Sequence, residues 1–195
     1  FVLMLWAMAI MGLKTRDLMR ERRAFAEPEL HFEAGRTLLP EDARAASRQL
    51  ERLAPTFRQT LLPRAIRTAL MRFQATGNVQ DVAHAVGEVC EAENDRLDAE
   101  LSMVRYIAWA IPSIGFIGTV RGIGEALGQA NRAVEGDITG VTESLGVAFN
   151  STFVALVISI LLMFLMHQLQ LMQERLVLDA QRHLNDTLIP HLKSS

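Results

Sequence analysis

The chain has 195 residues, of which 50% are hydrophobic and 22% are charged, and its formal net charge is -2 at pH 7. So small a charge leaves no basic surplus for a polyanion, which argues against nucleic acid as a partner. The single cysteine, Cys90, excludes an intrachain disulfide or a cysteine-based metal cluster, and we expect it to be a small buried residue. No Asp, Glu, Lys or Arg occurs from Ser144 to Gln173. This charge-free run exceeds the roughly 20 apolar residues that cross a bilayer as a helix, so the sequence predicts a membrane protein.

The first apolar segment, residues 1–13, reads FVLMLWAMAIMGL and precedes a basic stretch. The basic residues of that stretch are Lys14, Arg16, Arg20, Arg22 and Arg23. A helix of this length covers about 20 Å, which is too short to cross a bilayer alone. A secretion signal would carry its basic residues before the apolar run. We therefore interpret the segment as the inner end of a transmembrane helix, truncated in this chain.

Residues 14–105 form a charged region whose apolar residues recur at helical spacing. One helical pattern opens at Pro40-Glu41-Asp42 and runs through Leu50, Leu53, Phe57, Leu61 and Leu62. Gly77-Asn78 provides a stop signal. From Val79 there is no breaker before Pro112, so we expect one long helix that passes from this region into the membrane. No β-alternation of useful length occurs, and the sequence predicts an all-α fold.

The second apolar segment, residues 106–128, and the third, residues 145–167, are each long enough to span a bilayer. The connection between them, residues 129–144, is short and mainly acidic, whereas basic residues follow the first segment. The positive-inside rule therefore assigns residues 14–105 and the tail, residues 168–195, to the cytoplasm and the connection to the periplasm. We expect three transmembrane helices in the given chain, with the tail continuing the third as a cytoplasmic helix.

Both long segments carry a face of small residues spaced alternately by four and three. In the second segment these are Ala108, Pro112, Gly115, Thr119, Gly122 and Ala126, and in the third Ala148, Thr152, Ala155 and Ser159. Gly118 and Gly122 add a small-xxx-small pair on a neighbouring face. The larger side chains are expected in other directions, namely Ile107, Ile111, Phe116, Ile117 and Val120. Small residues at this spacing let another helix of a partner or neighbour approach closely, and hydroxyls can bond across the contact or line a polar path.

Two interpretations of the hydroxyl residues stay open. The faces could serve packing alone, with each threonine bonding the carbonyl one turn back. Alternatively, Thr119, Thr152 and Ser159 line an ion pathway.

The remaining polar residues of the apolar segments indicate no metal site and no catalysis. Arg121 and Glu125 are the only formal charges of the second segment, and we expect them near the outer interface as an ion pair or as snorkelling groups. His84 and His167 have no neighbours at ligand spacing, so we expect no metal. There is no phosphate loop, His-x-x-x-His helix or paired membrane carboxylate, and we expect neither an enzyme nor a cofactor.

Two motifs give the chain a resemblance to a known family. Residues 112–126, PSIGFIGTVRGIGEA, resemble the second-helix signature of the MotA/TolQ/ExbB proton-channel family, and residues 147–160, VAFNSTFVALVISI, resemble its following helix. The order of apolar and charged regions is also similar. The sequence departs from the family pattern in three places: Ala155 stands where Gly is usual, no proline occurs in the region from Ser159 to Leu162, and Arg121 interrupts an apolar stretch.

The resemblance implies a ring of five copies in a bacterial inner membrane, around two copies of a MotB/TolR/ExbD-like partner. Each partner would have one transmembrane helix bearing an Asp, past which protons or sodium ions flow, with Thr119 and Thr152 lining the path. The flow would drive flagellar rotation, outer-membrane energisation, gliding or phage defence. The alternative is an oligomeric membrane scaffold or signalling subunit without ion conduction, in contact with lipid but not with nucleic acid.

Overall fold

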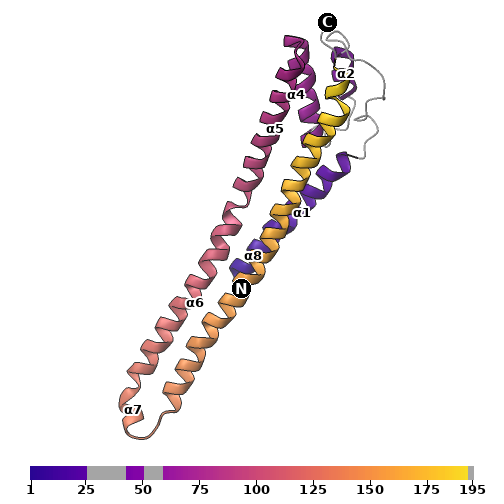
Figure 1. The fold of residues 1–195 in the computed structure, drawn as a ribbon. Helices are drawn as coiled ribbons and strands as arrows, with labels where there is room; N and C mark the ends of the chain where they lie inside the picture. Colours follow the sequence, from indigo (N-terminus) through magenta and orange to yellow (C-terminus); the bar gives the residue numbers. More distant parts are fainter. Residues whose placement is uncertain (26–42, 51–58, 193–195) are drawn as a thin grey trace. The chain divides into compact units, whose positions relative to one another are not determined.

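A computed structural model describes residues 1–25, 43–50 and 59–192, and these residues contain helices but no strand (Figure 1). The helices are α1 (Val2–Ala24), α2 (Ala43–Leu50), α4 (Leu61–Thr76), α5 (Val79–Glu100), α6 (Ser102–Gly128), α7 (Ala130–Val134), α8 (Thr139–Thr187) and the 3₁₀ turn η2 (Ile189–His191). The predicted all-α fold is confirmed for this part of the chain. The expected helical positions Leu53 and Phe57 and the expected start at Pro40-Glu41-Asp42 lie outside the described residues.

The chain divides into two compact units. The first, which we call the apolar unit, consists of Phe1–Leu13 and Leu101–Leu169. The second, the charged unit, consists of Lys14–Glu100 and Gln170–Ser195. Helices α1 and α8 each contribute residues to both units, whereas α5 belongs to the charged unit and α6 to the apolar unit.

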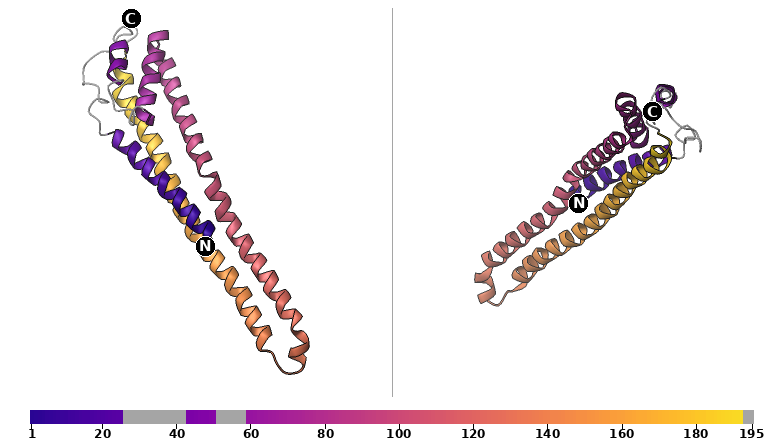
Figure 2. Two further views of the ribbon diagram at one scale, coloured as in Figure 1. Left: turned by 180° about the vertical axis from the view of Figure 1, so that it is seen from behind. Right: turned by 45° about the horizontal axis from the view of Figure 1, so that its top comes forward.

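Within the apolar unit, α6 and α8 run antiparallel and side by side, joined through the short α7 (Figures 1 and 2). Two helical runs are long and apolar enough to cross a membrane, Val79–Gly128 and Thr139–His191. Only 28% and 22% of their most apolar windows are buried, so the chain itself leaves most of this apolar surface uncovered. This exposed apolar surface must therefore be covered by lipid or by other chains. Helix α1 is not one of these two runs, and the third span stays a prediction.

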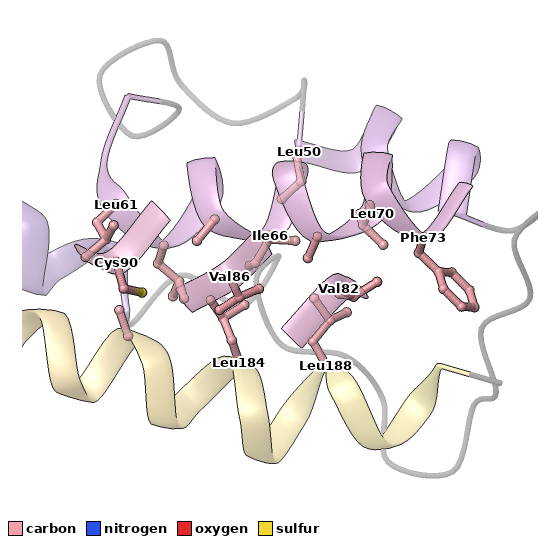
Figure 3. Packing of buried hydrophobic residues seen from close by; sticks show 14 of the residues in the cluster. Leu50, Leu61, Ile66, Leu70, Phe73, Val82, Val86, Cys90, Leu184 and Leu188 are labelled. Atoms are coloured by element: carbon pink, nitrogen blue, oxygen red, sulfur yellow. The ribbon is translucent and has the colours of Figure 1, made fainter. Parts of the chain in front are cut away.

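The charged unit is built on a hydrophobic core of α2, α4, α5 and the end of α8 (Figure 3). Leu61, Ile66, Leu70 and Phe73 of α4 are fully buried there, as is Leu184 of α8. Cys90 lies in this core, and burial raises the pKa of its thiol. The prediction of Cys90 as a small buried residue is confirmed, and its raised pKa disfavours the reactive thiolate.

Two helix ends show how far local signals determine the boundaries. Helix α4 ends at Thr76, and Gly77 follows in the left-handed region with φ 62°, where its N–H bonds the Phe73 carbonyl at 2.8 Å. The predicted stop at Gly77-Asn78 is confirmed, because glycine adopts this conformation at little cost. The predicted helix from Val79 continues to Gly128 with one irregular residue, Leu101, whose carbonyl still accepts the Arg105 N–H at 3.0 Å.

Candidate functional site

The candidate site is the contact between α6 and α8 in the apolar unit, where glycines of α6 face small residues of α8. A methyl group built on Gly115 would lie 2.5 Å from Ala155 Cβ, and one on Gly122 would lie 2.6 Å from Ala148 Cβ. At Gly118 it would lie 2.7 Å from the hydroxyl of Ser151. All three separations are shorter than a van der Waals contact. At Gly115 and Gly122 the opposing atoms are Cβ and backbone atoms that cannot rotate away, so these two positions require glycine for this approach of the helices.

Two threonine hydroxyls meet in the middle of this contact. The Oγ1 atoms of Thr119 and Thr152 contact each other, and both side chains are half-buried. The Thr152 hydroxyl is also placed to donate to the Gly115 carbonyl at 2.8 Å. The Thr119 hydroxyl has two carbonyls in reach, that of Ala148 at 3.1 Å and that of Gly115 at 3.4 Å. Each hydroxyl has one proton and several acceptors, so the pair can redistribute its bonds without moving the helices.

Ser159 lies further along α8, toward its C-terminus, and has a different environment. Its hydroxyl donates to the Ala108 carbonyl at 2.7 Å, and both residues are buried. The carbonyl of Ala108 would normally accept the N–H of the residue four positions later, but that residue is Pro112, which has no N–H. The hydroxyl from α8 therefore satisfies a carbonyl that the proline leaves without a helical donor.

Replacing Ser159 by Ala should lower the stability of the chain in detergent by about 1 kcal/mol or more, because the buried Ala108 carbonyl loses its donor. The Pro112→Ala change supplies a backbone N–H, so the double variant should recover much of this loss. Thermal unfolding of the two single variants and the double variant measures the coupling. Ser113→Ala is the control, since this exposed hydroxyl bonds only the carbonyl of Trp109, one turn back. An equal loss of stability in Ser159→Ala and in the double variant would contradict the bond from Ser159 to the Ala108 carbonyl.

The predicted packing residues occupy the α6–α8 contact to different extents. Ala108, Gly115, Gly122, Ala126, Ala148 and Ala155 are buried, whereas Pro112 and Gly118 are half-buried. Ile107 and Ile111, which were expected in other directions, are also buried, with 3% and 8% exposed. Phe116, Ile117 and Val120 do point away and are more than half exposed. The buried side of α6 thus changes from mainly large side chains in its N-terminal half to small ones in its C-terminal half.

The two charges of the second apolar segment form a surface pair. Arg121 Nε donates to Glu125 Oε1 at 2.9 Å across one helical turn. The two side chains are 82% and 53% exposed, so they take no part in the threonine contact. The ion pair of Arg121 with Glu125, one of the two roles expected from the sequence, is present.

Sequence reasoning missed two polar residues of α8. Ser151 bonds the Ala148 carbonyl at 2.8 Å and faces Gly118. Asn150 is exposed and lines an open groove of 600 Å³ along the contact, together with Ile114, Gly118, Val147 and Val154. The run Asn150-Ser151-Thr152 inside a charge-free segment was the signal that could have found them. Across the described ranges, no group of three or more His, Cys, Asp or Glu residues is arranged to hold a metal.

Comparison with known proteins identifies a family. The family model of the MotA/TolQ/ExbB proton channel family matches residues 43–182, which include both long helices of the apolar unit and much of the charged unit. Comparison with curated proteins and with solved structures gives no significant match.

Proposed function

The chain belongs to the MotA/TolQ/ExbB proton channel family, and we propose that it is the ring-forming subunit of a membrane complex that conducts protons or sodium ions and converts their flow into movement. Family membership supports a role in a membrane energiser or motor complex. The two long apolar helices, largely uncovered by the chain itself, supply the membrane-spanning wall that such a role needs.

The observation that carries the proposal is the pair formed by Thr119 and Thr152. Both hydroxyls lie within the apolar segments of their helices, residues 106–128 and 145–167, and they contact each other across the α6–α8 contact. In an apolar environment a hydroxyl is one of the few groups that can exchange hydrogen bonds with a passing ion or its water. The pair therefore supports an ion path along the α6–α8 contact.

Within the apolar segments, the titrating group of the path would come from another chain. The third apolar segment contains no carboxylate, and Glu125 of the second is engaged with Arg121 at the surface. We therefore propose a partner of the MotB/TolR/ExbD type, with one transmembrane helix bearing an Asp. Five copies of the chain would surround two copies of the partner in the bacterial inner membrane, with the charged unit in the cytoplasm.

Co-expression with such a partner tests this arrangement. Under the proposal, the reading frame next to the gene encodes a short protein with one apolar helix containing an Asp, and the two proteins purify as one complex. A density map of that complex should contain five copies of the chain around two helices. A map of the chain alone as a closed assembly would contradict the proposal.

A scaffold or signalling subunit is the second candidate, and one observation favours it. Thr119, Thr152 and Ser159 all bond carbonyls of the same chain, as residues that only pack helices would. Under this alternative, Thr→Ala changes alter assembly before they alter any ion-dependent activity. Measuring assembly and ion flux on the same preparation separates the two candidates.

A further inference from the structure

The charged unit contains a polar cavity of 430 Å³ that the proposed ion path does not use. Its walls come from α1, α5, α8 and the residues just before α4. They carry both acidic and basic side chains together with one buried amide, among them Lys14, Glu21, Glu93, Arg96, Glu100 and Gln173.

Most charges around this cavity neutralise one another. Glu93 is 3% exposed and accepts bonds from Arg64 at 3.0 Å and from Arg96. Glu100 pairs with Lys14 at 2.7 Å and with Arg96 at 3.6 Å. Both carboxylates are therefore engaged in ion pairs with cations of the same unit.

Glu21 is different, because within the described ranges no cation forms an ion pair with it. Its Oε2 accepts the backbone N–H of Leu61 at 2.8 Å, in the first turn of α4. Burial raises the pKa of Glu21, and the charge of Glu93 raises it further, while the Leu61 N–H, Arg96 and Arg64 lower it. Glu21 is thus the lining carboxyl that can change its protonation state without breaking an ion pair.

Gln173 gives an independent sign that the cavity holds hydrogen-bonding molecules. The residue is 4% exposed and lines the cavity, yet its side-chain amide has no hydrogen-bond partner among the described residues. The residue has little contact with bulk solvent, whereas the polar cavity that it lines has room for ordered water. Water in the cavity would satisfy the amide and connect it to Glu21.

We propose that this cavity is a water-filled proton-exchange site, in which Glu21 takes up and releases the protons that the complex conducts. A hydronium ion in the cavity gives its proton to the Glu21 carboxylate and becomes water. The carboxyl then gives the proton to a water open to the solvent and returns to carboxylate. The proposal rests on the proposed function, because it needs a proton flow to serve.

The cavity-lining helices connect along the chain to the apolar unit, which contains the proposed ion path. The helices that line the cavity continue directly into the apolar unit, α1 at Leu13, α5 through Leu101 to α6, and α8 at Leu169. The charged groups that face Glu21 are Lys14, Asp17 and Arg20 of α1, Arg64 of α4, and Glu93, Arg96 and Glu100 of α5. Helix α8 contributes only the uncharged Gln173 and Leu176 to the lining.

The test is proton flux in inverted membrane vesicles that contain the full complex, because their outer buffer sets the pH of the cytoplasmic face. Glu21→Gln should lower the flux by about tenfold or more, as expected when a proton-transfer group is lost. It should also remove a step from the dependence of flux on outer pH. Glu91→Gln, the same change at an exposed position of α5, should leave both unchanged. A Glu21→Gln complex with wild-type flux and pH profile would overturn the proposal.

Glu21→Gln should fold, because an amide oxygen can still accept the Leu61 N–H. Burial raises the pKa of Glu21 and so favours its protonated form. The protonated carboxyl therefore stabilises the folded state below about pH 4.5, and this stabilisation is lost as the pH rises. The variant should therefore unfold at a higher temperature than the wild type at pH 7, and this difference should shrink as the pH falls to 4.5. Thermal unfolding across this range measures it. If the variant does not assemble, Glu21→Asp keeps a carboxyl and should shift the pH step, and an unshifted step would overturn the proposal.

The threonine variant separates this inference from the proposed function. If Thr152→Val removes the flux and Glu21→Gln does not change it, the exchange site fails while the ion path stands. If neither variant changes the flux, both fail.

Discussion

Thr152→Val is expected to lower ion flux through the assembled complex by about tenfold or more, because a lost hydrogen bond of about 1.5 kcal/mol at the barrier slows passage by that factor. Valine has nearly the shape of threonine, so the α6–α8 contact should keep its packing. The Gly115 carbonyl, which Thr152 bonds at 2.8 Å, still has the Thr119 hydroxyl in reach. Flux in vesicles, divided by the amount of assembled complex, measures the effect.

Thr142→Val is the matched control, since Thr142 is exposed at the start of α8 and its hydroxyl bonds only the nearby carbonyls of Ile138 and Thr139. Its flux should equal that of the wild type. Unchanged flux in Thr152→Val, or an equal loss in both variants, would count against an ion path at the threonine pair.

Gly115→Ala is expected to destabilise the chain by about 1–3 kcal/mol, the usual cost of overpacking. The new methyl would lie 2.5 Å from Ala155 Cβ and 3.2 Å from Thr152 Cα, and backbone cannot rotate away as a side chain can. The helices must therefore separate, which also pulls Thr119 and Thr152 apart. We expect reduced thermal stability in detergent together with reduced flux.

Gly124→Ala provides the comparison on the same helix. A methyl at Gly124 meets no heavy atom within 4 Å, and alanine is favoured over glycine in a helix by about 0.5–1 kcal/mol. This variant should be as stable as the wild type or slightly more so. The close contact at Gly115 would be disproved as a determinant of stability if both glycine variants unfolded at the same temperature.

The parts of the fold that sequence could predict are those determined by local periodicity. The 4, 3, 4 spacing from Ala148 to Ser159 depends only on helix geometry, and it predicted a packing face that the structure brings against α6. The left-handed glycine at Gly77 ends a helix for equally local reasons. Such features require no knowledge of which helix lies opposite.

Features that depend on the opposite helix were beyond sequence reasoning. The sequence around Ile107 and Ile111 does not indicate that they are buried in protein, because an apolar residue of a membrane helix can equally well face lipid. The bond from Ser159 to Ala108 needs the antiparallel register, across 51 positions of the chain. The ion pair of Lys14 with Glu100, 86 positions apart, needs the packing of the charged unit.

The decisive experiment is gradient-driven ion flux in vesicles that contain this chain with and without its single-helix partner. If the chain lines a path whose titrating carboxyl belongs to another subunit, the chain alone conducts nothing. The complete complex then conducts, and replacing the partner's membrane Asp by Asn abolishes the flux. Flux from the chain alone, or full flux with the Asn partner, would contradict a path that depends on the carboxyl of another subunit.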